Sequence, residues 1–346
     1  MAEIFREGRP HRARRLPDGR FEMSIRIPTA DGLIGRVCPA GDCSPAYFRV
    51  KPGTGLTSQE AAFCPYCRHE AVPDEFTTRG QLEYARETVT AEAAAGVERM
   101  LGEALGLDGS GRRHIGGGFL SLDISMDRRP ARPVSPPLED ELRRDLTCPT
   151  CGLAHAVYGL ATWCPDCGKD IFVTHVRSEI AVVRRMLEAV DSRRRELGAR
   201  VAARDIENAL EDAVSIFEAV LKALLRRYLR GRESEEAIEK ALRRGYQDPV
   251  SAAEGFKKLT GKDLDPEAIA KLAGTFSKRH PIAHNLGVVD RRYLERARSA
   301  ELHGREVHVD IPEVEQALQV VETVLQAAHE TLFPDSSPAA EGTDGR

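Results

Sequence analysis

Apolar and polar residues alternate in three short stretches of the N-terminal part of the chain. These stretches cover residues 21–27, 46–50 and 120–124. Because successive side chains of a strand point to opposite faces, this period of two predicts half-buried β-strands. We expect the first two strands to belong to one small sheet and the third to join a neighbouring one.

Apolar residues at helical spacing dominate two other parts of the chain. Residues 78–106 carry such residues in a Glu- and Ala-rich stretch that ends at a glycine, which predicts one long helix. From Val176 onward apolar residues recur every three or four positions. Asp248, Asp265 and Asp310 each precede a proline by one or two positions and can cap a helix there. We predict a bundle of five or six helices over roughly 176–333.

The cysteines form four close pairs, and no cysteine is left over. The pairs are Cys38/Cys43, Cys64/Cys67, Cys148/Cys151 and Cys164/Cys167. Their spacings, C-x4-C-x20-C-x2-C and C-x2-C-x12-C-x2-C, define two quartets that can each place four thiolates around a tetrahedral ion. We therefore predict two structural Zn²⁺ sites, which fold zinc-ribbon modules and leave no open ligand position for catalysis.

Other uses of paired cysteines fit this sequence less well. Disulfides need an oxidising compartment, and we do not expect secretion, because the basic residues of the first segment are not followed by an apolar stretch. A redox CxxC pair occurs near a βαβ pattern, which this sequence does not show. Iron fits four thiolates as zinc does. Pairing between quartets, such as Cys64/Cys67 with Cys148/Cys151, stays open, although nearer partners cost less loop-closure entropy.

These patterns predict an α+β multidomain protein with two small β zinc-ribbon modules followed by an all-α helical bundle. The strand at 120–124 is expected to join one of the ribbons, after a flexible Gly-rich connector at 109–118. The predicted segments are a first ribbon at 1–78, a long helix and strand at 79–127, a Pro-rich linker at 128–139, a second ribbon at 140–173, the bundle at 174–334 and a disordered tail at 335–346.

Composition excludes some classes of protein. Charged residues make up 30% of the chain, and no apolar run approaches the roughly 18 residues of a membrane-spanning helix. We expect a cytoplasmic protein with no membrane partner. The balance of 50 Lys+Arg against 54 Asp+Glu gives a net charge of −4. This balance argues against a protein that coats nucleic acid by bulk charge, but it leaves room for a local basic groove.

One segment of the predicted bundle concentrates residues that can carry chemistry. They are Arg279, His280, His284 and Asn285. The R-x4-H spacing occurs three times in the sequence, but Arg6/His11 lies in a polar N-terminal arm and Arg298/His303 in a charged connector. Only the pair at 279 and 284 lies where the bundle can position a site.

This segment resembles the HEPN family, whose small helical bundles carry R-x4–6-H with a polar residue after the arginine. Arg279, His280 and His284 fit that pattern, and the run through Asp290, Tyr293 and Leu294 is also similar to such domains. The resemblance covers about 160 residues of the predicted bundle and none of the ribbons. It implies a metal-independent endoribonuclease of the toxin or antiviral defence type, with two motifs meeting at a homodimer interface.

The chemistry of RNA cleavage suits these side chains, because the 2′-hydroxyl of RNA is itself the nucleophile. His284 is the expected general base or acid, since imidazole exchanges protons near neutral pH. Arg279 would hold the phosphate and stabilise its developing charge, with His280 or Asn285 orienting it. The expected partner is RNA, and the products would end in a 2′,3′-cyclic phosphate.

Two other functions stay open. The ribbons can belong to a non-catalytic sensor or adaptor that dimerises through the bundle and binds a protein trigger or an antitoxin. DNA binding by the ribbons is the other, although no basic recognition helix lies beside either quartet.

We also expect an ordinary i,i+4 contact between Glu218 and Lys222. Surface or loop positions are expected for His69, His114, His155, His175 and His329.

Overall fold

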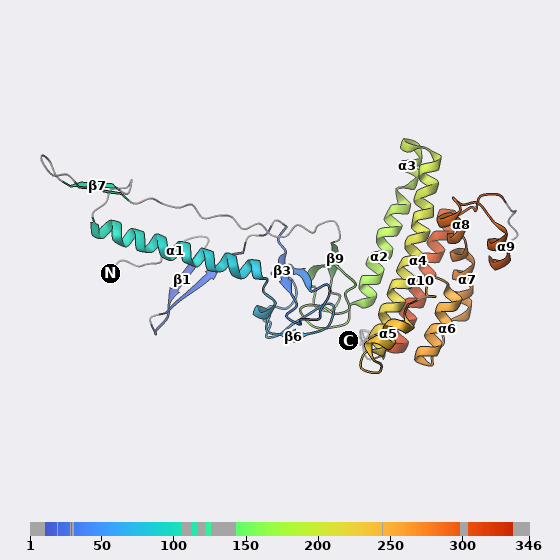
Figure 1. The fold of residues 1–346 in the computed structure, drawn as a ribbon, viewed down its shortest axis with the longest axis horizontal. Coiled ribbons are helices and arrows are strands. Elements are labelled where there is room, and N and C mark those ends of the chain that lie inside the picture. Colours follow the sequence, from blue (N-terminus) through green and yellow to red (C-terminus); the bar gives the residue numbers. More distant parts are fainter. Residues whose placement is uncertain are drawn as a thin grey trace, which may run out of the picture.

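The computed structural model describes residues 11–105, 112–115, 122–125, 143–297 and 304–334, apart from residues 19, 28, 30 and 244. A small β region that holds the cysteines is followed by a mostly helical C-terminal region (Figure 1). We call residues 31–77 and 143–171 the β region, and residues 172–334 the helical region. Among the described residues, no helix is long and apolar enough to span a membrane.

Two strands from each half of the β region form a single antiparallel sheet with the order β3-β4-β10-β9. They are β3 (Ile34–Val37), β4 (Tyr47–Val50), β9 (Arg144–Thr147) and β10 (Ala154–Val157). In the central pair, Phe48 lies opposite Val157 and Val50 opposite His155. The two predicted ribbons are therefore joined edge to edge, an arrangement that was not predicted.

An approximate two-fold relation connects the two halves of the β region. The CPYC turn (residues 64–67) and the CPDC turn (residues 164–167) have the same sequence pattern 100 positions apart. β5 (Ala62–Phe63) pairs with β6 (Glu70–Ala71) around the first turn, and an isolated bridge joins Trp163 to Asp170 around the second. The backbone N–H of Phe63 donates to Pro165 O at 2.9 Å, and that of Trp163 donates to Pro65 O at 3.2 Å. Each turn thus holds the other.

Both halves of the β region share one hydrophobic core. It contains the buried residues Cys38, Phe48, Cys64, Phe76, Leu146, Cys148, Leu153, Val157, Ala161, Cys164 and Ile171. Phe76 comes from the short 3-10 helix η1 (Pro73–Phe76) and meets Phe48 edge to face, with ring centroids 5.9 Å apart. Because one core serves both cysteine quartets, we expect the two halves to stabilise each other.

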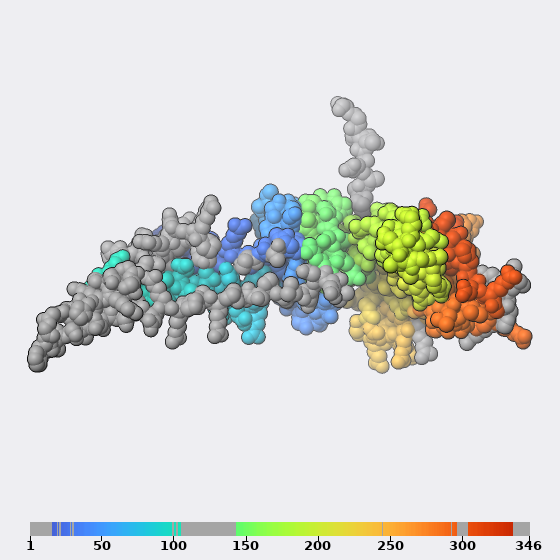
Figure 2. Space-filling model, turned by 90° about the horizontal axis from the view of Figure 1, so that it is seen from above, coloured from blue at the N-terminus to red at the C-terminus, as the bar shows by residue number. Residues whose placement is uncertain are grey.

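Three elements lie beyond the shared sheet. The predicted long helix is confirmed as α1 (Arg79–Leu105), and the β region lies between it and the helical region (Figure 2). β1 (His11–Arg15) pairs with β2 (Phe21–Ile25), and β7 (Arg112–Ile115) pairs with β8 (Leu122–Ser125). The expectation that the strands at 21–27 and 46–50 share one sheet was therefore wrong, because β2 pairs with the nearby β1 while β4 lies in the shared sheet.

The pairing of β7 with β8 corrects two predictions. The strand expected at 120–124 does not join a ribbon in the described residues, because its partner is β7. β7 in turn occupies part of the predicted flexible connector at 109–118. A sheet-forming partner only a few residues away costs little loop-closure entropy, which favours this local hairpin. The predicted Pro-rich linker and C-terminal tail lie outside the described residues.

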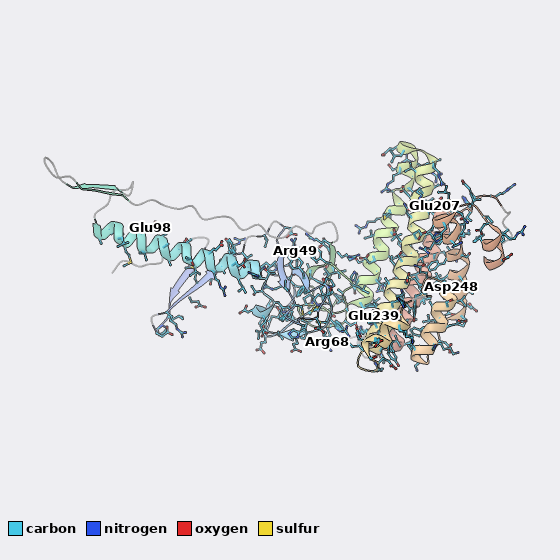
Figure 3. The ribbon with its side chains drawn as sticks, viewed as in Figure 1. Arg49, Arg68, Glu98, Glu207, Glu239 and Asp248 are labelled. Carbon is cyan, nitrogen blue, oxygen red and sulfur yellow. The ribbon has the colours of Figure 1, made fainter. Side chains whose placement is uncertain are left out.

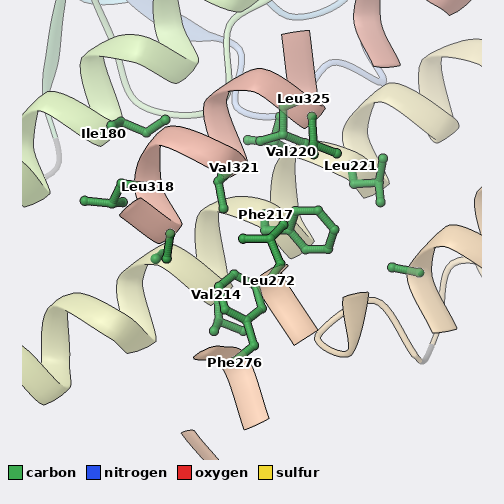
Figure 4. Packing of buried hydrophobic residues seen from close by; sticks show 14 of the residues in the cluster. Ile180, Val214, Phe217, Val220, Leu221, Leu272, Phe276, Leu318, Val321 and Leu325 are labelled. Carbon is green, nitrogen blue, oxygen red and sulfur yellow. The ribbon is translucent and has the colours of Figure 1, made fainter. Parts of the chain in front are cut away.

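The helical region is built around α4 (Ala199–Leu229), which packs against α2, α3 and α10. Phe217 and Leu221 of α4 meet Leu325 and other apolar side chains in the common core (Figure 4). The described part of this region contains the helices α2 (Phe172–Glu188), α3 (Val190–Leu197), α4, α5 (Glu235–Ala241), α6 (Pro249–Thr260), α7 (Pro266–Ser277), α8 (Arg279–His284), α9 (Arg291–Ala297) and α10 (Ile311–Leu332). Prediction gave fewer helices because α3, α5, α8 and α9 are too short for a clear period.

The predicted capping residues are confirmed at three helix starts. The side chain of Asp248 accepts a hydrogen bond from Ser251 N at 2.8 Å at the start of α6. Asp265 and Asp310 cap α7 and α10 in the same way, and a proline lies in the first turn of each of the three helices. These caps supply acceptors for backbone N–H groups that the helices themselves leave unpaired.

A buried ionic junction joins the β region to the helical region. Asp170, whose side chain is 6% exposed, accepts from Arg227 Nη1 at 2.6 Å and lies 3.1 Å from His329 Nε2. The Arg227 guanidinium lies 5.0 Å from the Trp163 ring centroid and 3.9 Å from that of Phe333. Such a pair is stable only when both members remain, because each would otherwise be a buried, unpaired charge.

Three histidines that were predicted at the surface or in loops lie in the interior. His155, His175 and His329 are all buried. His329 stacks on Phe172 with ring centroids 5.5 Å apart, and His175 Nδ1 accepts from Ala161 N at 2.8 Å. His329 lies 159 residues from its partner Asp170, so no local pattern marks it as buried. His155 and His175 have partners nearer in the sequence, at Leu153 and Glu179.

Candidate functional site

The eight cysteines form two groups, which we call the first cluster (Cys38, Cys43, Cys64, Cys67) and the second cluster (Cys148, Cys151, Cys164, Cys167). All eight are free thiols, and the four Sγ atoms of each cluster lie within 4.8 Å of one another. This grouping is the one that the spacing predicted. Pairing between the two quartets, which the sequence left open, does not occur.

The sulfur distances fit a tetrahedral metal ion. Sγ–Sγ distances are 3.6 Å for Cys38 to Cys67 and 3.7 Å for Cys148 to Cys167. Four thiolates bound at about 2.3 Å around a tetrahedral ion lie about 3.8 Å apart. Each cluster can therefore hold one metal ion with four protein ligands, and the closed ligand set is typical of a structural site.

The chain itself orients these sulfurs. Tyr66 N donates to Cys64 Sγ and Asp166 N donates to Cys164 Sγ, each at 3.4 Å. Both turns then require a left-handed backbone: φ is 62° at Arg68 (Figure 3) and at Gly168. Glycine adopts this conformation without strain, whereas arginine does not. The N–H groups stabilise negative charge on sulfur, as outer-shell donors do in metal sites.

Burial makes the thiolate form costly unless a cation is present. It raises the pKa of the Cys43 thiol and that of the Cys151 thiol to about 12. By contrast, a hydrogen bond with the Cys164 thiol lowers the pKa of Cys148 to about 4. A divalent cation is needed to hold four thiolates together at neutral pH, so metal binding releases protons and strengthens as pH rises.

The predicted catalytic segment lies in and directly after α8. Because proline disfavours helix at the preceding residue, Pro281 favours a helix boundary between Arg279 and His284. The structure places that boundary at Lys278, so both residues lie in α8, with Pro281 in its first turn. Proline is accommodated there because the N–H groups of a first turn have no helical partner.

Arg279 is held by residues that the sequence analysis did not identify. Its Nε donates to Glu211 Oε2 of α4 at 2.6 Å, and its Nη1 donates to Gln247 Oε1 at 2.9 Å. Burial, together with the charge of Glu211, raises the pKa of the neighbouring Asp212. No sequence signal could have identified these partners, since Glu211 and Gln247 precede Arg279 by 68 and 32 residues.

The two histidines of this segment lie side by side. His280 and His284 are four residues apart in α8, and their ring centroids are 5.0 Å apart. His284 is exposed, and His280 is half-buried. Asn285 Nδ2 donates to Asp290 Oδ2 at 2.8 Å, so its amide secures the loop after α8. The imidazoles and the arginine therefore lie on one short helix, while Asn285 faces the following loop.

The remaining predicted pair is an ordinary helix contact, as expected. Lys222 and Glu218 form an i,i+4 ion pair on α4. Lys222 Nζ also lies 5.7 Å from the centroid of the Tyr246 ring. This arrangement explains the pair without a catalytic role.

No protein-family model, curated protein or solved structure matches the chain. What the molecule does must therefore be inferred from its own residues and their geometry.

Proposed function

We propose that the helical region is a metal-independent endoribonuclease with its active site on α8, as the resemblance to the HEPN family implies. The observation that carries this proposal is the pair of adjacent imidazoles, His280 and His284, whose ring centroids are 5.0 Å apart. Arg279 begins the same helix. A base, an acid and a cation are the three groups that cleavage through the 2′-hydroxyl requires.

In this mechanism one imidazole removes the proton from the 2′-hydroxyl, whose oxygen then attacks the neighbouring phosphorus. The bond from phosphorus to the 5′-oxygen breaks, and the leaving oxygen takes a proton from the other imidazole. The products are a 2′,3′-cyclic phosphate and a 5′-hydroxyl. His284 is the more accessible of the two histidines, so we assign it the first contact with RNA.

Arg279 stabilises the charge that develops on the phosphate. Its Nε and Nη1 are occupied by Glu211 and Gln247, and its Nη2 has no hydrogen-bond partner among the described residues. Glu211 therefore acts as a positioning residue that fixes the guanidinium while donors stay available to phosphate. In the resembled family two such sites meet in a homodimer, and we propose the same assembly, with a toxin or antiviral defence role.

The test is cleavage of a mixed RNA pool by purified protein in excess EDTA, with the product ends mapped. His284→Ala should abolish the cyclic-phosphate ends, and His308→Ala, at an exposed histidine of the helical region, should leave them unchanged. The metal content of all three proteins is measured afterwards, because loss of structural metal would mimic loss of activity. Equal activity of wild type and His284→Ala would refute the assignment.

The ion pair between Arg279 and Glu211 favours a second, non-catalytic function. If that pair is only structural, the protein is a non-catalytic sensor or adaptor that dimerises through its helices. Absence of cleavage by metal-loaded wild type, together with equal losses of stability in Arg279→Gln and Glu211→Gln, would support the adaptor. In either case we propose that the clusters hold zinc, and metal analysis distinguishes zinc from iron.

A further inference from the structure

A cavity of about 230 Å³ lies between the two halves of the β region, and we call it the seam cavity. Residues of both halves line it, among them Ile34, Arg36, Phe48, Val50, Leu153 and Asp166. Arg36 lies opposite Phe48 and Ile34 opposite Val50, so these four side chains share one face of the sheet. The cavity exists only because the two halves are joined.

Arg36 gives this cavity a positive charge. Its side chain is half-buried, and among the described residues it forms no ion pair; its one hydrogen bond is a long one, 3.5 Å, from Nη1 to Gly35 O. Arg49, on the opposite face of the sheet, is by contrast paired with Asp31 at 3.1 Å (Figure 3). Lys51 adds a second, exposed cation to the lining. The Asp74 carboxylate attracts this guanidinium only from beyond ion-pair distance. The partly desolvated guanidinium therefore favours an anionic ligand in direct contact.

Hydrogen-bond acceptors line the same cavity. Asp166 is 4% exposed; its Oδ2 accepts from Leu56 N at 2.5 Å, and its Oδ1 accepts no hydrogen bond from the described residues. Gln59 donates its Nε2 to Asp166 O at 3.2 Å, and its Oε1 is likewise without a donor among the described residues. A ligand that fills the cavity must therefore bring donors as well as an anion, because a buried acceptor left unpaired is costly.

We infer that the seam cavity binds one nucleotide, with the base inside and the phosphate against Arg36 and Lys51. Pockets for drug-sized ligands enclose about 300–1,000 Å³, so a cavity of about 230 Å³ suits one ring system. The N–H groups of a base can donate to Asp166 and Gln59. The flat faces of the base ring can pack against the apolar side chains that line the cavity. A peptide C-terminus also carries an anion, an apolar group and N–H donors, so it is the competing ligand that the test must exclude.

The nucleotide can be free or belong to a single-stranded RNA, whose unpaired bases are open to such contacts. This inference goes beyond the proposed cleavage, because it needs no catalysis by the helical region. Binding in the absence of cleavage and cleavage in the absence of binding are separate results, so either proposal can fail alone.

The test uses the full chain carrying two metal ions, with His284→Ala added so that RNA stays intact. Isothermal titration measures binding of four 5′-mononucleotides, a short single-stranded RNA and a peptide with a C-terminal leucine. We expect Arg36→Gln to weaken nucleotide binding roughly tenfold or more, because the substitution removes the charged guanidinium and its two parallel N–H donors to phosphate. Arg26→Gln, at an exposed arginine outside the cavity, should change it less than twofold.

Two further variants probe the interior. Ala62→Leu fills the cavity and should abolish binding, with metal content and circular dichroism confirming the fold. Gln59→Ala, at an exposed position, keeps the fold and should weaken binding while changing the preference among bases. Binding of mononucleotides identifies a free nucleotide as the ligand, and binding of RNA alone identifies a strand. The inference is overturned if no nucleotide or RNA binds, if the peptide binds more tightly, or if Arg36→Gln and Ala62→Leu leave the affinity unchanged.

Discussion

The CPYC and CPDC turns have nearly the same local design and very different surroundings. Each places a cysteine pair, a sulfur-directed N–H and a left-handed residue at the same positions, 100 residues apart. At the position three residues after the last cysteine, Glu70 is exposed, whereas Asp170 is buried against Arg227 and His329. A repeated cysteine turn thus has a docking role in one copy only.

The largest expected effect is the loss of one metal site. Cys64→Ser and Cys164→Ser should each reduce the metal content from two ions to one per chain. Metal binding supplies on the order of 10 kcal/mol to such sites, which is comparable with the stability of a whole domain. Because the CPDC turn is next to the helical region, Cys164→Ser should also lower the melting temperature of the helices more than Cys64→Ser does.

Circular dichroism at a helical wavelength, together with metal analysis of the same samples, measures both consequences. Equal losses of helix stability in the two variants would show that the β region unfolds as one unit. In that case the difference between the two turns would have no consequence for the helical region.

The next effect concerns the junction itself. Asp170→Asn removes the charge that pairs Arg227 in a buried setting and should cost about 3 kcal/mol or more in the free energy of unfolding. Glu70→Gln, the matched change in the first turn, should cost less than about 0.5 kcal/mol, because Glu70 is exposed. Urea unfolding measures both values, and a cost below 1 kcal/mol for Asp170→Asn would contradict the docking role.

The junction should also respond to acid. Burial alone would raise the pKa of Asp170, but the His329 hydrogen bond and the Arg227 charge outweigh it and hold that pKa below its ordinary value. A lowered folded-state pKa adds stability above the unfolded pKa of about 3.9, and this stability is lost as pH falls through the folded value. The stability difference between wild type and Asp170→Asn should therefore shrink below about pH 4. If the stability difference between the two proteins does not change with pH, the charge of Asp170 is not its source.

The smallest effect concerns the left-handed residues of the two turns. Arg68→Gly should stabilise the first turn by up to about 1 kcal/mol, since glycine removes the strain of a positive φ but loses more backbone entropy on folding. Gly168→Ala should destabilise the second, because a Cβ there would lie 3.0 Å from the Phe63 ring. Thermal unfolding of both variants compares the turns directly, and a gain in stability at residue 168 would contradict this account.

The sequence predicted features that depend on neighbouring residues. Both cysteine clusters, the long helix at α1 and the aspartate caps are confirmed because spacing or local pattern determines each of them. The shared sheet was missed, since β4 and β10 are four residues long and lie far apart in the chain. The CPYC and CPDC repeat was the available signal for that relation.

Contacts between distant residues account for the other missed features. Asp170 meets His329, 159 residues later, and Arg279 meets Glu211, 68 residues earlier. Arg36 became a candidate only when the sheet placed it beside a cavity lined from both halves. Neither composition nor periodicity contains such information, because it depends on packing and not on local preference.

The pairing of β4 with β10 has a consequence for synthesis on the ribosome. Val50, the last residue of β4, precedes Ala154, the first of β10, by 104 positions. At about 5–20 residues per second, β4 waits about 5–20 s for its partner after it is made. The first cluster is complete in sequence by Cys67 and can take up its metal during that interval. For those seconds the edge of β4 that later pairs with β10 is open, which makes this the period in which aggregation or chaperone capture competes with folding.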